Sequence, residues 1–387
     1  MMQLATRPFW LVGFRPFFAL ACLSGLSLPL LWVLIFLGLV PAPALPVAPV
    51  QWHAHEMFFG FGWAVLGGFL LTATKNWVAV RGYHGAALMF LATAWLFERI
   101  GMWFGGLWPA WLFAFSNTLF LASIVAMLLW TLLRHRKSDS YRDNYVFLLI
   151  LPAFLLAKHW LLSAEHFQVG MVTTIGLFRM AFLVMLERTL TQFMKNIFQA
   201  NILRNATLDR AIKLLGLLLV GAGLMPTWLA GWISLLLALL LTGRLLFWKP
   251  HLALRRLDLG IMYLGYGAIV LQLLVEFLGQ IAQPAWIGSF SVHIFTLGAM
   301  GLIIPAMLIR IAKGHTGRKV MFEAIDKLVL WIMIAAFVLR VIAPQLDPAA
   351  YPLWILLAAC GWFCGFAILA WRLIPFLVHA RVDGKEH

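Results

Sequence analysis

Histidines and acidic residues that lead into apolar segments are the residues of this chain best suited to chemistry. The stretch QWHAHEMFFGFG, residues 51–62, places His53, His55 and Glu56 at the start of a long apolar run. Imidazole nitrogens bind metals and haem iron, and a carboxylate inside a membrane can carry protons. His53 and His55 are about 200° apart around a helix, so a regular helix cannot direct both at one centre. Either the helix begins between them, or they have different partners.

A third histidine, His293 in SFSVHIFTLGAMGLIIP, also leads into an apolar run. We expect it to enter the membrane from the same side as His53 and His55, at a similar depth. Histidines from facing helices can supply both axial ligands of a haem, or one ligand beside a copper ion. Glycines nearby would let a flat macrocycle approach the helices, although they suit close helix packing equally well: Gly60, Gly62, Gly67, Gly68, Gly298 and Gly301.

A fourth histidine, His315, lies in KGHTGRKV, residues 313–320. It follows His293 by roughly 33 Å along a continuous helix, so the two cannot share a site unless the helix breaks, for example at Pro305. We expect a separate haem or metal site at the inner membrane face, with Arg318 or Lys75 holding anionic groups. The alternative is a helix C-cap followed by a turn, since Gly314 and Gly317 suit left-handed positions.

Membrane helices must position these residues. The chain has 387 residues, of which 63% are hydrophobic and 11% charged, and its mean hydropathy is +0.93. A soluble domain carries about a quarter charged residues, whereas apolar runs of about 20 residues can each cross a bilayer core. We expect one all-α, polytopic transmembrane domain over residues 1–387, with twelve spans: 17–40, 53–74, 83–102, 108–133, 144–163, 169–187, 211–229, 231–248, 259–281, 290–311, 324–343 and 351–376.

The basic residues predict the topology. The formal net charge is +15, and most of the 29 Lys and Arg lie near the termini or in alternate loops, while the intervening loops have none. The positive-inside rule then places both termini in the cytoplasm. Because this excess follows the loops, it does not indicate a nucleic-acid partner. The loop at 188–210 mixes apolar and basic residues, which predicts an interfacial helix on the inner surface.

Charged residues also occur within the predicted spans, where each costs about 3 kcal/mol to insert. The topology puts most of them, and five histidines, in the outer half: His53, His55, Glu56, Glu98, Arg99, Lys158, His159, Glu165, His166, Glu276, His293 and Arg340. Arg179 lies nearer the middle. Each residue alone has an ordinary structural explanation, but together they predict a polar pocket beneath the outer face. We expect Glu56, Glu98 and Glu276 to relay protons, and Arg99, Arg340 or Lys158 to pair with haem propionates.

Several blocks of the sequence resemble the NnrS family: FRPFF (14–18), WHAHEMFFGF (52–61), GGFLLTATKNW (67–77) and HIFTLGAMGLIIPAMLIRIAKGHTGR (293–318). The resemblance covers essentially the whole chain and is weaker at ERTLTQFMKNI (187–197), where Glu187 and Gln192 depart from the pattern. That family comprises twelve-helix bacterial inner-membrane proteins associated with haem, copper and the response to nitric oxide. The resemblance implies haem or metal roles for four residues: His53, His55, His293 and His315.

The expected function is therefore nitric oxide handling, as a haem-containing reductase or detoxifier in denitrification or nitrosative stress. Such an enzyme needs a metal centre, with b-type haem and copper as the candidates, together with protons and electrons. Quinol or a periplasmic protein would donate the electrons, since no flavin or NAD motif is visible. The alternative is a non-catalytic haem or copper protein that senses nitric oxide or passes metal on. A transporter would require symmetric polar residues in both halves, and the outer bias disfavours it. The expected partners are nitric oxide, membrane lipid and quinol, while the oligomeric state stays open.

Overall fold

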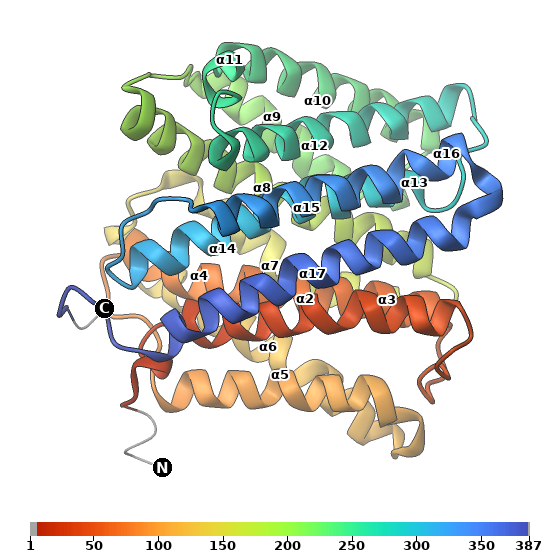
Figure 1. Ribbon diagram of the computed structural model, residues 1–387, viewed down its shortest axis with the longest axis horizontal. Coiled ribbons are helices and arrows are strands. Elements are labelled where there is room, and N and C mark those ends of the chain that lie inside the picture. The colour runs from red at the N-terminus through yellow and green to blue at the C-terminus, as the bar shows by residue number, and fades with distance from the viewer. Residues whose placement is uncertain (1–5, 386–387) are drawn as a thin grey trace. The chain divides into compact units, whose positions relative to one another are not determined.

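The computed structural model describes residues 6–385, and its regular elements are helices (Figure 1). This described part of the chain contains no β-strand. Backbone contacts divide the chain into two compact units. The first unit comprises the residues up to Phe167, Leu308–Met321, and the residues from Phe363 onward; the second comprises Gln168–Met307 and Phe322–Trp362.

The first unit is formed mainly by the N-terminal helices. Its elements are η1 (Pro8–Trp10), α2 (Phe14–Phe36), α3 (Pro49–His55), η2 (Glu56–Gly62), α4 (Trp63–Trp77), α5 (Ala86–Phe104), η3 (Gly105–Leu107), α6 (Ala110–Arg134), η4 (Arg136–Ser138), η5 (Arg142–Asn144) and α7 (Tyr145–Leu162). The element η2 is a π-helix, and it joins α3 and α4 into one continuous helical segment, Pro49–Trp77.

The second unit begins with α8. Its elements are α8 (Phe167–Phe198), α9 (Ala206–Val220), η6 (Ala222–Leu224), α10 (Thr227–Phe247), α11 (Pro250–Ala253), α12 (Leu257–Ile281), α13 (Phe290–His293), the π-helix η7 (Ile294–Met300), α15 (Ala324–Val341), α16 (Ala343–Leu346) and η8 (Pro348–Ala350). Two helices, α14 (Gly301–His315) and α17 (Tyr351–Val378), begin in the second unit and end in the first.

Ten helical segments among the described residues are long and apolar enough to cross a membrane. The predicted all-helical membrane architecture is therefore confirmed. The helices α9 and α15 occupy parts of two further expected spans, 211–229 and 324–343, but neither is among those ten. Twelve spans and cytoplasmic termini stay predictions.

The segment 188–210 differs from its prediction as a surface helix. The helix α8 continues without a break to Phe198 (Figure 1). Glu187, directly before this segment, is buried and accepts hydrogen bonds from Arg204 at 2.6 Å, Lys213 at 3.1 Å and Arg244 at 3.2 Å. Within the segment, Arg204 and Asp209 pair with each other at 3.2 Å, so part of its charge is used inside the second unit.

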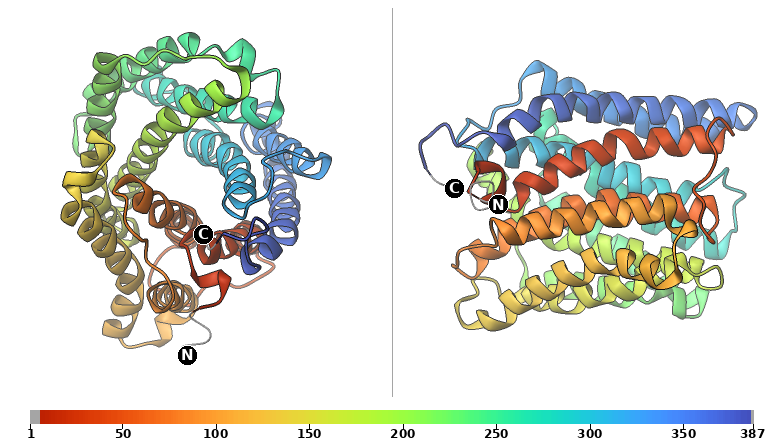
Figure 2. Two further views of the ribbon diagram at one scale, coloured as in Figure 1. Left: turned by 90° about the vertical axis from the view of Figure 1, so that its left-hand side faces the viewer. Right: turned by 90° about the horizontal axis from the view of Figure 1, so that it is seen from below.

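Two polar side chains join distant helices of the first unit at their ends. The Gln51 amide donates to the carbonyls of Leu161 and Ser163, each at 3.2 Å, and so ties α3 to the end of α7. Arg15 Nη1 donates to Leu377 O at 2.8 Å and His379 O at 2.6 Å, where α2 begins beside the end of α17 (Figure 2). These contacts fix the axial alignment of the helices that carry the site.

Candidate functional site

Five side chains of the first unit form a buried group that we name the His55 cluster: His55, Glu56, Glu98, Arg99 and Lys158. They come from α3, η2, α5 and α7. The side chains of His55 and Glu98 are fully buried, and those of Glu56, Lys158 and Arg99 are 3%, 5% and 12% exposed. Burial of this many charges is expensive in a membrane unless they are paired.

The His55 ring lies between two carboxylates. Its Nδ1 is 3.1 Å from Glu56 Oε1, and its Nε2 is 3.3 Å from Glu98 Oε1. Arg99 spans the same two acids, with Nη1 2.9 Å from Glu56 Oε1 and Nη2 2.9 Å from Glu98 Oε1. The cluster thus combines two carboxylates and two basic side chains around one imidazole ring.

Lys158 completes the cluster from α7. Its ammonium group donates to Glu98 Oε1 and to the backbone carbonyl of Asn117 on α6. The other oxygen of Glu98, Oε2, is buried and accepts no hydrogen bond. Glu98 therefore keeps one oxygen where a proton could reside.

Local backbone geometry places His55 and Glu56 within this cluster. Pro49 occupies the first turn of α3, and seven residues of π-helix follow directly after His55. π-Helical turns are rare and occur mostly at functional sites. Gly60, inside the π-helix, lies against Arg99: a Cβ there would be 2.2 Å from Arg99 Nη1. The Trp95 indole, also on α5, donates to Gly60 O at 3.0 Å and so holds the π-helix against α5.

His53 has a different partner from His55, which is one of the two alternatives that their angular separation left open. Both lie within the regular helix α3. The His53 ring stacks on Trp32, with 4.4 Å between the ring centroids and 13° between the planes. The structure thus does not direct the two histidines at one centre.

Several expected members of the outer pocket lie outside the His55 cluster. Three of its expected members are exposed in the first unit: His159, Glu165 and His166. Two others lie in the second unit. Glu276 accepts from Arg179 Nη1 at 3.2 Å, and Arg340 Nη2 lies 3.5 Å from the Tyr351 hydroxyl.

The glycines near the histidines are packed against protein side chains. A Cβ would lie 2.7 Å from Ile124 at Gly67, 2.7 Å from Phe17 at Gly68 and 2.8 Å from Phe337 at Gly298. At Gly301 it would lie 2.9 Å from Trp362. Of the two interpretations of these glycines, the structure shows close helix packing.

His293 is oriented by its own backbone. Its Nδ1 lies 2.8 Å from Ser289 O, and because a carbonyl only accepts, Nδ1 carries the proton. The lone pair then resides on Nε2, which is the arrangement typical of a histidine that binds a metal. The segment Phe290–His315 is helical throughout, with Pro305 inside α14, so His293 and His315 stand near its two ends.

His315 lies among cations of the first unit. We name this group the His315 cluster: Arg15, Lys75, His315, Arg318 and Arg381. The His315 ring packs on Phe14, with centroids 5.4 Å apart, and Arg381 Nη1 donates to His315 O at 2.9 Å. Arg318 Nη1 donates to Thr316 Oγ1 at 2.8 Å. The side chain of Lys75 lies within electrostatic reach of both His315 and Arg381.

The His315 cluster has more positive than negative charge. Asp383 pairs with Arg381, at 2.9 Å from Nε and 2.5 Å from Nη2, and these hydrogen bonds lower the pKa of Asp383 to about 2. Arg15 is buried, and its Nε and Nη2 have no hydrogen-bond partner. The cluster thus has an excess of positive charge, and the roles of Arg318 and Lys75 in holding an anionic group stay predictions.

Sequence reasoning missed residues that position the His55 cluster. Asn117 contributes a backbone oxygen, which no sequence pattern reveals. Gly60 and Trp95 contribute close packing against Arg99, whose guanidinium carbon lies 5.3 Å from the Trp95 ring. The sequence does place Trp95 four residues before Arg99, and this spacing puts both side chains on one face of a helix. That spacing was the signal from which their contact could have been predicted.

Comparison with known protein families identifies the chain. A family profile described as NnrS protein matches residues 8–381, which is nearly all of it. The chain belongs to the NnrS family. Members of the NnrS family are associated with the nitric oxide response and with haem and copper. No curated protein sequence matches the chain.

The described side chains do not themselves form a multidentate metal site. No group of three or more His, Cys, Asp or Glu residues between residues 6 and 385 is arranged to hold a metal ion. His55 does not fit a metal ligand in this conformation, because a carboxylate faces each of its nitrogens. His293, whose Nδ1 donates to Ser289 O, has a ring orientation that would suit a single ligand to a haem or a metal ion.

Proposed function

We propose that this NnrS-family chain reduces nitric oxide within the membrane, with protons passing through the His55 cluster and electrons coming from a quinol. Two nitric oxide molecules and one quinol give one nitrous oxide, one water and one quinone. An N–N bond forms and one N–O bond breaks. The released oxygen takes up the two protons, and the quinol supplies the two electrons.

The position of His55 between two carboxylates is the observation that carries this proposal. The hydrogen bond from His55 Nδ1 to Glu56 Oε1, at 3.1 Å, offers one step for a proton, and Nε2 lies 3.3 Å from Glu98 Oε1 without a hydrogen bond, close enough for a small rotation of the ring to form one. Arg99 lies beside both carboxylates and Lys158 lies beside Glu98, so each acid has a basic neighbour. The free oxygen of Glu98 then offers the next acceptor. Buried ionisable residues of this kind mark proton pathways in membrane proteins.

A haem of b-type, or a copper ion, would bind nitric oxide and transfer electrons when present. Within the second unit, His293 fits its ligand, and Arg340, which pairs with no carboxylate among the described residues, fits an anionic substituent. Within the first unit, His315 is a further ligand candidate, with Arg318 and Lys75 beside it for anionic groups. Glu276 stays a proton-carrier candidate of the second unit, where it pairs with Arg179.

The test is anaerobic nitric oxide consumption by the purified, cofactor-loaded protein with reduced quinol, followed with an electrode and by gas chromatography of nitrous oxide. Glu98→Gln should lower the rate by roughly a hundredfold, the usual contribution of a proton-transfer group. The matched control is Asp258→Asn, which removes a buried carboxylate paired with Arg256. Equal rates for Glu98→Gln and the control would show that the protons do not pass through the His55 cluster. Nitric oxide binding without any consumption by the unaltered protein would instead support the sensor alternative.

A further inference from the structure

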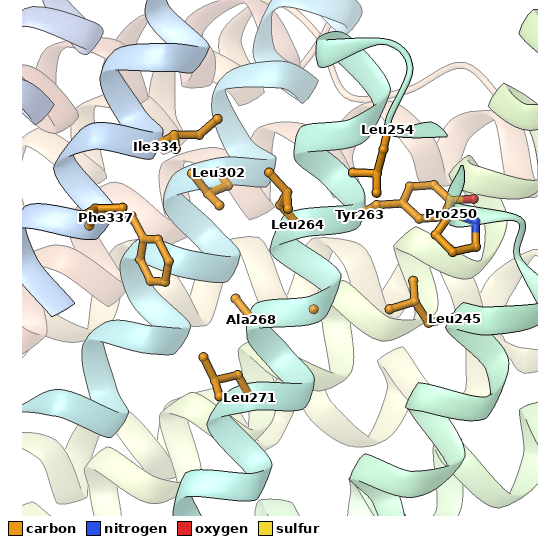
Figure 3. Close-up of a pocket in the computed structure, with 12 residues that line it drawn as sticks. Leu245, Pro250, Leu254, Tyr263, Leu264, Ala268, Leu271, Leu302, Ile334 and Phe337 are labelled. Carbon is orange, nitrogen blue, oxygen red and sulfur yellow. The ribbon is translucent and has the colours of Figure 1, made fainter. Parts of the chain in front are cut away.

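An apolar groove lies on the second unit, between α10, α12, α14 and α15 (Figure 3). Its volume is about 430 Å³, and almost all of its lining atoms are apolar. The floor is formed by α12, from Tyr263 to Leu271, over roughly 12 Å of helix. Leu245 and Phe337 line the sides. A groove of this kind suits a hydrocarbon chain rather than a polar ligand.

Gly267 makes the groove deep at its centre. This residue lines the groove, and a Cβ at its position would meet no atom within 4 Å. Nearby Gly265 is different, since a Cβ there would be 2.5 Å from Ile303. Gly267 is therefore not needed for helix packing, and its missing side chain leaves space along α12.

Cations flank one end of the groove. Pro250 and Leu254 line this end, opposite Leu271 (Figure 3), with Lys249 immediately before the first and Arg255 immediately after the second. Arg255 is exposed, and its side chain makes no ion pair within the described residues. The neighbouring arginine is already occupied, because its guanidinium holds Asp258 through two hydrogen bonds of 3.1 Å.

We propose that this groove binds an acyl chain of an anionic membrane phospholipid, whose phosphate is held by Lys249 and Arg255. The groove holds the acyl chain, and Lys249 and Arg255 neutralise the phosphate at the end of the groove that is next to the loop between α10 and α12. By the positive-inside rule this loop faces the cytoplasm, whose leaflet carries anionic lipids. The proposal is independent of nitric oxide reduction.

A quinol fits the groove less well than a phospholipid. A quinol headgroup is uncharged and would leave Lys249 and Arg255 without a counterion. The one polar side chain of the lining, the Tyr263 hydroxyl, already donates to Trp248 O at 2.8 Å. Charge complementarity therefore favours the phospholipid.

The test is native mass spectrometry of the purified full chain, titrated with phosphatidylglycerol or phosphatidylcholine of identical acyl chains. We expect one phosphatidylglycerol to remain bound, about 25-fold more tightly than phosphatidylcholine, from roughly fivefold for each cation. Gly267→Leu should abolish this retention. Gly279→Leu is the matched control on the same helix, since a Cβ at Gly279 also meets no atom within 4 Å but lies outside the groove.

A second variant tests the headgroup contact separately. Lys249 has a φ of 55°, a left-handed conformation that glycine adopts without strain, so Lys249→Gly removes the charge while preserving the backbone. Combined with Arg255→Gln, it should abolish the preference for phosphatidylglycerol and leave weak binding of both lipids. Equal retention of the two lipids by the unaltered protein would overturn the proposal, as would a bound quinone or unchanged retention in Gly267→Leu.

Discussion

His55 and His293 occupy the same position relative to a π-helix. Each is the last α-helical residue before seven π-helical residues, η2 in one case and η7 in the other. Each π-helix is followed by an α-helix of 15 residues, α4 or α14, whose third-last residue is a lysine, Lys75 or Lys313. These are the second and tenth predicted spans, so they do not follow a six-plus-six repeat, which would pair the second with the eighth. The two segments thus share a local geometry that sets a histidine at the start of a π-helix.

The cofactor role of His293 can be tested by spectroscopy. Without this imidazole, an axial ligand would be lost, and we expect His293→Ala to lose or shift the haem Soret band while still inserting in the membrane. The control is His379→Ala, because the Nδ1 of His379 makes the same hydrogen bond to a carbonyl four residues earlier, at 2.7 Å. Identical spectra for the two variants would exclude His293 as a ligand.

Removal of Lys158 should destabilise the first unit. Glu98 would lose the cation that donates to it, and breaking one side of a buried pair costs about 3–5 kcal/mol. Thermal unfolding in detergent should show a large drop in melting temperature for Lys158→Met. The double variant Lys158→Met/Glu98→Gln should recover part of it, because no buried acid is left with a missing partner. The exposed Lys319 provides the control, Lys319→Met, which should change the unfolding free energy by less than about 0.5 kcal/mol.

Gly60→Ala should disturb the His55 cluster by steric overlap. The new Cβ would lie 2.2 Å from Arg99 Nη1, so the guanidinium must move away from the two carboxylates. Overpacking of this kind costs about 1–3 kcal/mol. Gly243→Ala on α10 is the counterpart, since its Cβ meets nothing within 4 Å, and it should be neutral or stabilising by up to about 1 kcal/mol. Equal melting temperatures for the two variants would show that Arg99 has room to adjust.

The predicted topology can be tested with single cysteines. Lys137 and Ala42 are both exposed, and they lie in a basic loop and in a loop without basic residues. In a chain whose native cysteines are replaced by alanine, a membrane-impermeant maleimide added to intact cells should label Ala42→Cys but not Lys137→Cys. The opposite labelling pattern would show that the chain is oriented the other way across the membrane.

Apolar run length and loop charge made much of the helical architecture predictable. The same depth assignment also placed Glu98 and Lys158 near one another, and the structure has them in contact. The position of His55 between two carboxylates could not be predicted, because it depends on a π-helix, which produces no hydrophobic period of its own. The ion pairs of Glu187 could not be predicted either, because its three cationic partners are between 17 and 57 residues away in the sequence.

Arg15 has a consequence for the order in which the chain can fold. Its side chain lies on the first long helix, yet its two carbonyl partners, Leu377 and His379, follow 362 and 364 residues later. A guanidinium buried in a membrane without acceptors is costly, so Arg15 cannot settle into its final position until α17 has been synthesised. The second unit consists of Gln168–Met307 and Phe322–Trp362, so its residues leave the ribosome before the first unit is complete. Chains that end between Trp362 and Leu377 would therefore contain every residue of the second unit while the first unit is still incomplete.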